Sequence, residues 1–364
     1  MHKLVITATR SMRDYAAQVV KALEDFPHFS ALEDIDGVAL LNTSRFADGE
    51  MEVAVTSSIR GKDAVLFTSC ARNEAAIGVT EAKIELYHAV DAMKRCQPRR
   101  IIVFEPFVSC SRSDRTTGRS SVGLWVHFKT LMSLGTQHIV TYQLHSDKSK
   151  SIIDPAVCAV DDIPALNLLK QYLCDKYIRD RKTLETLVRR NWAFCSVDAG
   201  GEKIARGFAN AFGAPLVVAH KQRDYAKVNT IESINILSAE PLEGKVLWIV
   251  DDMVDTGGSV ESLIRTLGAL KPAEINIIAV HPIFSPPASQ RLRRLTEEGL
   301  LQRIMVTDTV HCPCSLQNEI PGLEVVSSVA LSAKVINAIF TNSSMRKLLR
   351  VFNAELYLSG KNQA

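Results

Sequence analysis

The sequence has no long run of basic residues and no apolar stretch near the roughly 18 residues of a membrane span. Its 43 Lys and Arg residues against 40 Asp and Glu leave a net charge of only +3. Nucleic acid or an anionic membrane surface is therefore disfavoured as the main partner. The N-terminus runs straight into the apolar segment Leu4-Val5-Ile6, with no charged-then-apolar leader. These absences predict a cytoplasmic protein that binds neither nucleic acid nor membrane.

The sequence also lacks a disulfide pattern. Its eight cysteines are scattered over 364 residues, mostly in apolar surroundings, which favours reduced structural thiols. His311-Cys312-Pro313-Cys314 is the one segment with zinc-site residue types, and no second ligand pair stands at a suitable spacing. We favour structural thiols there, with metal binding as the alternative.

Two common nucleotide-binding patterns are missing as well. There is no G-x-x-x-x-G-K-[ST] segment, and no G-x-G-x-x-G fingerprint follows an expected strand. An ordinary P-loop kinase and a dinucleotide-dependent enzyme are therefore disfavoured.

What the chain does contain is an alternation of short β-branched runs with longer amphipathic stretches. This alternation predicts parallel β-α-β units, and in such sheets ligands gather beyond the carboxyl ends of the strands. The expected strands are Leu4–Thr7, Ala64–Thr68, Ile101–Phe104, Ile139–Gln143, Ala193–Val197, Leu216–Ala219, Val246–Val250, Ile275–His281 and Ile304–Thr307. The expected helices include Ala75–Lys94, Leu124–Leu134, Ile163–Arg179, Glu202–Ala211 and Ser259–Leu270.

The length and the 46% hydrophobic content suffice for two domains. We predict an N-terminal domain over residues 1–160, a C-terminal domain over 161–345 and an extension over 346–364. The turn-rich crossover at Asp154-Pro155 and Asp161-Asp162-Ile163-Pro164 supports the first boundary.

The most informative segment is Lys245–Leu263, KVLWIVDDMVDTGGSVESL. The adjacent carboxylates Asp251 and Asp252 follow an expected strand and can accept hydrogen bonds from vicinal hydroxyls. The turn Asp255-Thr256-Gly257-Gly258-Ser259 precedes a helix, whose N-terminus can hold a phosphate. The pattern therefore predicts a sugar-phosphate site. The alternative is an acidic turn that caps a helix through Ser259.

This loop resembles the phosphoribosyl-pyrophosphate loop of type I phosphoribosyltransferase folds, which serves enzymes that consume that compound and the synthetase that makes it. Other segments of the sequence distinguish an enzyme that consumes this compound from the synthetase that makes it. In the order of the family they are RFADGE at Arg45–Glu50, SRSDR at Ser111–Arg115, SVDAGG at Ser196–Gly201, HKQR at His220–Arg223 and HPIFS at His281–Ser285. Over roughly residues 40–340, the chain is similar to the ribose-phosphate pyrophosphokinase (phosphoribosyl pyrophosphate synthetase) family.

The resemblance implies an α/β fold of two tandem type I phosphoribosyltransferase-like domains, each a mainly parallel sheet flanked by helices. It also implies an enzyme that transfers a pyrophosphoryl group from ATP to the anomeric hydroxyl of ribose 5-phosphate. Charge neutralisation and in-line positioning are the main demands of such a transfer. Lys221 and Arg223, expected in a loop, are then the catalytic pair.

The remaining roles are implied in the same way. Asp251 and Asp252 bind the ribose hydroxyls, directly or through a cation, and Asp255, Thr256, Gly257, Gly258 and Ser259 hold the 5-phosphate. Phe46, Asp48 and Glu50 contact the adenine of a neighbouring subunit's site, and Arg112, Asp114 and Arg115 contact ATP. His145 and Asp198 bind the cofactor Mg2+. The implied assembly is a homo-oligomer built from dimers, up to a hexamer.

The chain departs from the family pattern at Ser113, where Gln is usual, and at Gln143, where Asp is usual. Both changes fall on the nucleotide half and leave the ribose phosphate loop intact. They motivate a second hypothesis, a non-catalytic regulatory homologue that assembles with active subunits. A third is a phosphoribosyltransferase, and the ATP-type segments at Phe46–Glu50 and Arg112–Arg115 weigh against it.

Overall fold

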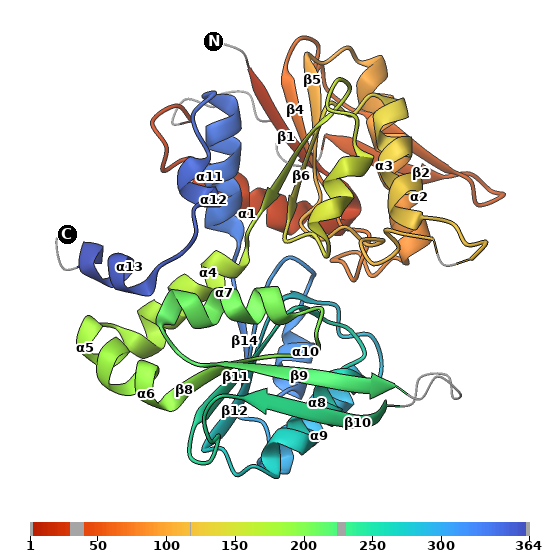
Figure 1. Cartoon of the computed structure of the whole chain (residues 1–364). Coiled ribbons are helices and arrows are strands. Elements are labelled where there is room, and N and C mark those ends of the chain that lie inside the picture. Colours follow the sequence, from red (N-terminus) through yellow and green to blue (C-terminus); the bar gives the residue numbers. More distant parts are fainter. Residues whose placement is uncertain (1–2, 30–39, 117, 224–230, 362–364) are drawn as a thin grey trace. The chain divides into compact units, whose positions relative to one another are not determined.

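A computed structural model describes residues 3–29, 40–116, 118–223 and 231–361, without the side chains of 221–233. Packing divides the chain into two compact units. Unit 1 comprises Met1–Pro164, Thr309–His311 and Ser327–Leu349, and unit 2 comprises Ala165–Asp308, Cys312–Val326 and Arg350–Ala364. Figure 1 shows the helices and strands of both units. None of the described helices is long and apolar enough to cross a membrane.

Unit 1 is built on a parallel sheet of five strands in the order β1-β4-β5-β6-β7. These strands are β1 (Leu4–Ala8), β4 (Asp63–Phe67), β5 (Arg100–Phe104), β6 (His138–Tyr142) and β7 (Ala159–Ile163). A separate antiparallel hairpin joins β2 (Leu41–Arg45) to β3 (Met51–Val55). The helices are α1 (Arg13–Leu23), α2 (Val79–Arg95), α3 (Gly123–Leu134), α11 (Val329–Phe340) and α12 (Arg346–Leu349), with 3-10 turns at Arg10–Met12 and Asp147–Ile152.

The two faces of this sheet are buried by different helices, because successive side chains of a strand point to opposite faces. On one face, Val5 and its neighbours share a buried cluster with residues of α2 and α3. On the other face, the ring of Phe104 lies 4.7 Å from that of Phe67 and 5.6 Å from that of Tyr142, measured between centroids. Tyr15 of α1 covers Phe67 with an edge-on ring contact. Strands buried on both sides explain the continuous apolar runs of the sequence.

Helix α11 belongs to unit 1 although it follows most of unit 2 in the sequence. The Tyr15 hydroxyl lies 2.7 Å from the hydroxyls of both Ser328 and Ser332, and the Tyr142 hydroxyl lies 2.5 Å from that of Ser332. These groups are buried, so each tyrosine hydroxyl needs the partner that this segment supplies. The predicted limits 1–160, 161–345 and 346–364 divide the chain by sequence, whereas packing groups 327–349 with the first unit.

Unit 2 contains a sheet of seven strands in the order β10-β9-β8-β11-β12-β13-β14, parallel except for β10. The strands are β8 (Trp192–Ser196), β9 (Leu216–Arg223), β10 (Ile231–Ser238), β11 (Val246–Val254), β12 (Glu274–Pro282), β13 (Arg303–Thr307) and β14 (Leu323–Val326). The helices are α4 (Leu166–Leu173), α5 (Arg181–Thr183), α6 (Arg189–Asn191), α7 (Glu202–Phe212), α8 (Gly258–Gly268), α9 (Ala288–Glu297), α10 (Cys314–Glu319) and α13 (Ala354–Lys361). Two π-helical turns cover Cys174–Ile178 and Leu184–Val188.

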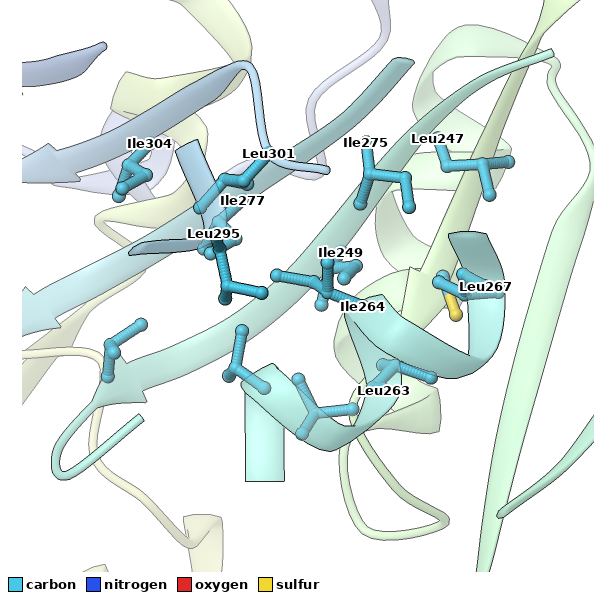
Figure 2. Close-up of a cluster of buried hydrophobic side chains, with 14 of the residues drawn as sticks. Leu247, Ile249, Leu263, Ile264, Leu267, Ile275, Ile277, Leu295, Leu301 and Ile304 are labelled. Atoms are coloured by element: carbon cyan, nitrogen blue, oxygen red, sulfur yellow. The ribbon is translucent and has the colours of Figure 1, made fainter. Parts of the chain in front are cut away.

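The core that holds the candidate loop lies between this sheet and α8 and α9. In Figure 2, Leu263 and Ile264 of α8 lie over Ile249, Ile275 and Ile277 of β11 and β12. All five side chains are at most 2% exposed. At roughly 1.5–3 kcal/mol for each buried side chain, this packing fixes the start of α8 relative to the carboxyl ends of the strands. The α/β fold with parallel sheets flanked by helices is thereby confirmed.

Two predicted boundaries are wrong here. The strand expected to end at Ala219 continues as β9 to Arg223, because its backbone pairs antiparallel with β10, as in Ile234 opposite Lys221. Lys221 and Arg223 therefore lie in a strand and not in the expected loop. The expected helix Ile163–Arg179 begins instead at Leu166, since Ile163 is the last residue of β7 and pairs with β6.

Candidate active site

The acidic pair of unit 2 lies inside β11, in the part of the strand that extends past its neighbour. β11 pairs with β8 up to Val250 opposite Ser196, but it continues along β12 as far as Val254 opposite Pro282. Asp251 and Asp252 therefore stand just beyond the end of β8. The backbone N–H of Asp252 donates to the Asp251 carboxylate, at 2.9 Å. The predicted strand end at Val250 is too early by four residues, because pairing with β12 continues.

The electrostatics of this edge favour a hydrogen-bond donor or a cation. Burial raises the pKa of Asp251 well above its usual range, and the neighbouring charges of Asp252 and Asp198 raise it further. Asp252 is only 5% exposed. Asp198 follows β8, and its carboxylate accepts the backbone N–H of Gly201 at 3.1 Å. Three carboxylates at adjoining strand ends repel one another, so hydroxyl donors or a divalent ion would relieve the repulsion.

The structure provides no closed metal cage in its described part. No group of three or more His, Cys, Asp or Glu side chains there is arranged to hold an ion. In the His311–Cys314 segment, Cys312 is buried and Cys314 exposed, and neither is in a disulfide. Mg2+ needs no such cage, since it keeps several waters and is usually held by one or two carboxylates together with substrate phosphates. The chemistry of Asp198, Asp251 and Asp252 fits an ion of that kind.

The loop after β11 leads into a helix whose N-cap residue is a glycine. Gly257 has a φ of 74°, a left-handed conformation that favours glycine, and it precedes the 11-residue helix α8. Because Gly257 holds the N-cap position and Ser259 lies inside the first turn, the alternative of Ser259 as the capping residue is wrong. The first-turn N–H groups and the helix dipole can then receive an anion.

Arg291 is a neighbour of this loop that the sequence analysis missed. Its Nη1 donates to the backbone carbonyl of Thr256 at 3.0 Å, and its Nε lies 3.4 Å from the Glu261 carboxylate. A Cβ at Gly258 would come within 2.9 Å of the same Nη1, so a larger residue there would displace the Arg291 side chain. Arg291 stands on α9, and nothing in the loop's own spacing marks it. It places a positive charge beside the candidate phosphate site.

In unit 1, Phe46, Asp48 and Glu50 form the tip of the β2–β3 hairpin. The N–H of Phe46 donates to the Glu50 carbonyl and the N–H of Gly49 donates to the Phe46 carbonyl, both at 2.9 Å. The Asp48 carboxylate accepts the N–H of Glu50 at 3.0 Å. This closed turn leaves the Phe46 ring 55% exposed. An exposed aromatic ring on a well-bonded tip is suited to stack on a flat ligand.

The other predicted nucleotide residues lie between β5 and α3. Arg112 and Arg115 are exposed, and Asp114 is half-buried. Between them, Ser113 attaches the segment to α3: its hydroxyl accepts the N–H of Gly123 at 2.9 Å, and its carbonyl accepts that of Leu124 at 3.1 Å. The short side chain at 113, where the family usually has Gln, thus has a structural role.

His145 is exposed and follows β6, as the sequence analysis expected of a strand end. The turn before it is fixed, because the N–H of Gln143 donates to the Ile163 carbonyl at 3.1 Å and that of Leu144 donates to the Asp162 carboxylate at 3.0 Å. The backbones of Lys221 and Arg223 lie in β9, and their side chains lie outside the described residues.

Within unit 2, the structure places Asp198, the acidic pair Asp251 and Asp252, and the glycine loop at the same edge of the sheet.

Comparison with known proteins gives two matching family models. Residues 4–135 match the N-terminal domain of ribose phosphate pyrophosphokinase, and residues 176–311 match the phosphoribosyl transferase domain. The ribose-phosphate pyrophosphokinase of Mycobacterium leprae is 30% identical over 347 residues, which is 95% of each chain. That of Prochlorococcus marinus is 31% identical over 309 residues, 84% of each chain. The crystal structure of phosphoribosylpyrophosphate synthetase from Mycobacterium smegmatis superposes with a TM-score of 0.77 at 27% identity, covering 94% of this chain and all of the other. The predicted resemblance and the two tandem phosphoribosyltransferase-like domains are confirmed.

Proposed function

This chain belongs to the ribose-phosphate pyrophosphokinase family, and on that premise we propose that it makes phosphoribosyl pyrophosphate and AMP from ribose 5-phosphate and ATP. The C1 oxygen of the sugar attacks the β-phosphorus of ATP and loses its proton. The bond between that phosphorus and the α,β-bridging oxygen breaks, and AMP leaves. The product serves nucleotide biosynthesis. The observation that carries the proposal is the acidic pair next to a helix N-terminus with glycine at its N-cap in unit 2.

In this proposal, Asp251 and Asp252 accept hydrogen bonds from the ribose hydroxyls. The loop Asp255–Ser259 and the first turn of α8 hold the 5-phosphate through N–H groups. The hydroxyl donors of the sugar would lower the raised pKa of Asp251, because they stabilise its charged form. Binding of the sugar and ionisation of this carboxylate therefore favour each other.

Lys221 and Arg223 supply the positive charge that the transferring pyrophosphoryl group needs in the transition state. Phe46 stacks on the adenine, with Asp48 and Glu50 as polar partners. Arg112, Asp114 and Arg115 contact the rest of ATP. The exposed ring of Phe46 on its closed hairpin supports this assignment.

Mg2+ is the proposed cofactor, with His145 and Asp198 as its protein ligands. When bound, it neutralises charge on the triphosphate. In unit 1, the exposed position of His145 leaves room for substrate phosphates and water as further ligands. In unit 2, the repulsion among the carboxylates around Asp198 favours a cation.

We also propose a homo-oligomer built from dimers, up to a hexamer, in which Phe46 reaches a neighbouring subunit's site. A cytoplasmic location is proposed because none of the eight cysteines is in a disulfide, as expected in a reducing compartment.

The test is product formation by the purified chain with ribose 5-phosphate, Mg2+ and ATP or another triphosphate. We expect phosphoribosyl pyrophosphate and AMP in equal amounts, and loss of both with Lys221→Ala. No product with any triphosphate, together with an altered rate in a mixture with an active homologue, would favour the regulatory hypothesis instead. Consumption of phosphoribosyl pyrophosphate with a free base would favour a phosphoribosyltransferase.

A further inference from the structure

Unit 1 contains a buried chain of polar side chains that the proposed reaction does not use. Nε2 of His127 lies 2.8 Å from the Glu105 carboxylate, and Nδ1 of the same ring lies 3.0 Å from the Tyr87 hydroxyl. Glu105 is 0% and His127 1% exposed. A carboxylate and an imidazole removed from water are costly unless they are paired, so this pair is maintained by a specific geometry.

Both ring nitrogens of His127 have a partner in this chain. Burial raises the pKa of Tyr87, and the nearby Cys70 and Glu105 raise it further, so its hydroxyl stays protonated. Nδ1 contacts this hydroxyl and Nε2 contacts the Glu105 carboxylate. A ring held at both nitrogens has a single preferred orientation.

The Glu105–His127 pair joins the two ends of the segment that carries the predicted ATP residues. Glu105 directly follows β5, and its N–H donates to the Val140 carbonyl at 3.0 Å. His127 lies in the first turns of α3, four residues after Gly123. The segment between them contains Arg112, Asp114 and Arg115. Ser113 is bonded to the N-terminus of the same helix.

We propose that the Glu105–His127 pair positions the segment 106–116 for the nucleotide and so sets the affinity for ATP. This inference rests on the proposed function only in assigning that segment to ATP. The pair fixes α3 relative to the end of β5, and Ser113 transmits this placement to the flanking Arg112 and Asp114. Ordering the segment before binding lowers the conformational entropy that the nucleotide must otherwise supply. Glu105 and His127 are positioning residues and touch no substrate.

The test replaces the pair without leaving a buried charge. In the double variant Glu105→Leu/His127→Phe, both polar groups are removed and apolar volume is retained. Such exchanges of buried pairs are often neutral for stability. Glu105→Gln is the conservative variant, because its amide oxygen still accepts the Nε2–H of His127.

The matched control is a second His–carboxylate pair in the same unit. Nε2 of His138, at the amino end of β6, lies 2.8 Å from the carboxylate of Asp161 in the middle of β7. His138→Phe/Asp161→Leu therefore removes the same chemistry from the opposite end of the strands. Melting temperature, the KM values for both substrates, and calorimetric binding of a non-hydrolysable ATP analogue with Mg2+ are measured for every variant.

For Glu105→Leu/His127→Phe we expect the KM for ATP and the Kd of the analogue to rise about tenfold, the order expected when the backbone of one more residue must be ordered on binding. The KM for ribose 5-phosphate should stay within about twofold. Glu105→Gln and the control pair should leave analogue binding unchanged. Unchanged analogue binding in the Leu/Phe variant, or an equal loss in the control, would overturn the inference. Calorimetry distinguishes this failure from absence of the proposed reaction, because it requires only that the analogue binds.

Discussion

Replacing Lys170 by Met should make unit 2 more stable at neutral pH. Lys170 lies on α4 and is only 7% exposed, with no acidic ion-pair partner among the described residues. Its ammonium group lies 4.7 Å from the centroid of the Phe208 ring on α7. Burial lowers the pKa of Lys170 from 10.5 to about 8. The folded state therefore holds a charge that is less stable there than in the unfolded chain.

The magnitude follows from the difference between the folded and unfolded pKa values. At about 1.4 kcal/mol for each pH unit, burial of the charged form costs about 3 kcal/mol at pH 7, where both states are protonated. The contact with Phe208 returns about 1–2 kcal/mol of this cost. Lys170→Met should then raise the free energy of unfolding by about 1–2 kcal/mol at pH 7, because methionine fills the same apolar space without charge.

The sign of the pH dependence follows from the linkage between folding and proton binding at Lys170. Between pH 8 and 10.5 the unfolded chain binds more protons at Lys170 than the folded chain, so the stability of the wild type rises with pH. The variant lacks this rise. The amount by which Lys170→Met is more stable than the wild type should therefore decrease above pH 8 and vanish or reverse near pH 10.

The assay is urea unfolding at pH 7, 8, 9 and 10, followed by tryptophan fluorescence in a Trp125→Phe background. This leaves Trp192 and Trp248, both buried in unit 2, as the reporters. The quantity compared is the difference in unfolding free energy between the wild type and Lys170→Met at each pH. All other titrating groups are the same in both proteins, so their contributions cancel in this difference. A difference that stays constant with pH, or a variant that is less stable at pH 7, would refute the reasoning.

Two further predictions concern the loop and the thiols. Arg291→Gln should raise the KM for ribose 5-phosphate about tenfold and leave the KM for ATP nearly unchanged, because the Thr256 carbonyl loses its charged donor. The control is Arg293→Gln on the same helix, which removes an exposed pair with Glu297 and should change neither KM value. A thiol reagent at pH 8 should label Cys314 first, since it is the exposed cysteine and burial raises the pKa of Cys195 to about 12 and that of Cys110 to about 11. Loss of the rapid phase in Cys314→Ser would confirm the assignment, and an unchanged rapid phase would contradict it.

Much of the fold could be predicted because its strands are buried on both faces. Runs such as Ile101–Phe104 and Val246–Val250 are continuous in apolar side chains, and the structure contains strands at both places. The edge strands of unit 2 were not predicted. β10 and β14 carry mixed polar and apolar residues, as in Leu323-Glu324-Val325-Val326, since an edge strand has less surface to bury. Their identity depends on a partner strand rather than on their own composition.

The candidate site divides in the same way. Asp251, Asp252 and the glycine loop are contiguous, so one segment of sequence displays the whole arrangement. Arg291 comes from another helix and approaches a backbone carbonyl, which no pattern in the loop records. Glu105 and His127 are separated by 22 residues and by the segment they fix. Each is an ordinary side chain in the sequence, and its role exists only once β5 and α3 have packed together.

The departures from the family pattern gain a physical meaning from this packing. The Ser113 hydroxyl accepts the Gly123 N–H at 2.9 Å from an oxygen bonded to Cβ, whereas the amide oxygen of a glutamine at 113 would stand two carbons further from the backbone and could not make this contact in the same place. Ser113 and the Glu105–His127 pair therefore form one arrangement, in which a small side chain permits close approach to α3 and a buried pair holds the helix there. Ser113→Gln alone should disturb the close contact between residue 113 and the start of α3. The effects of substitutions at 105, 113 and 127 are therefore expected to be coupled and not additive.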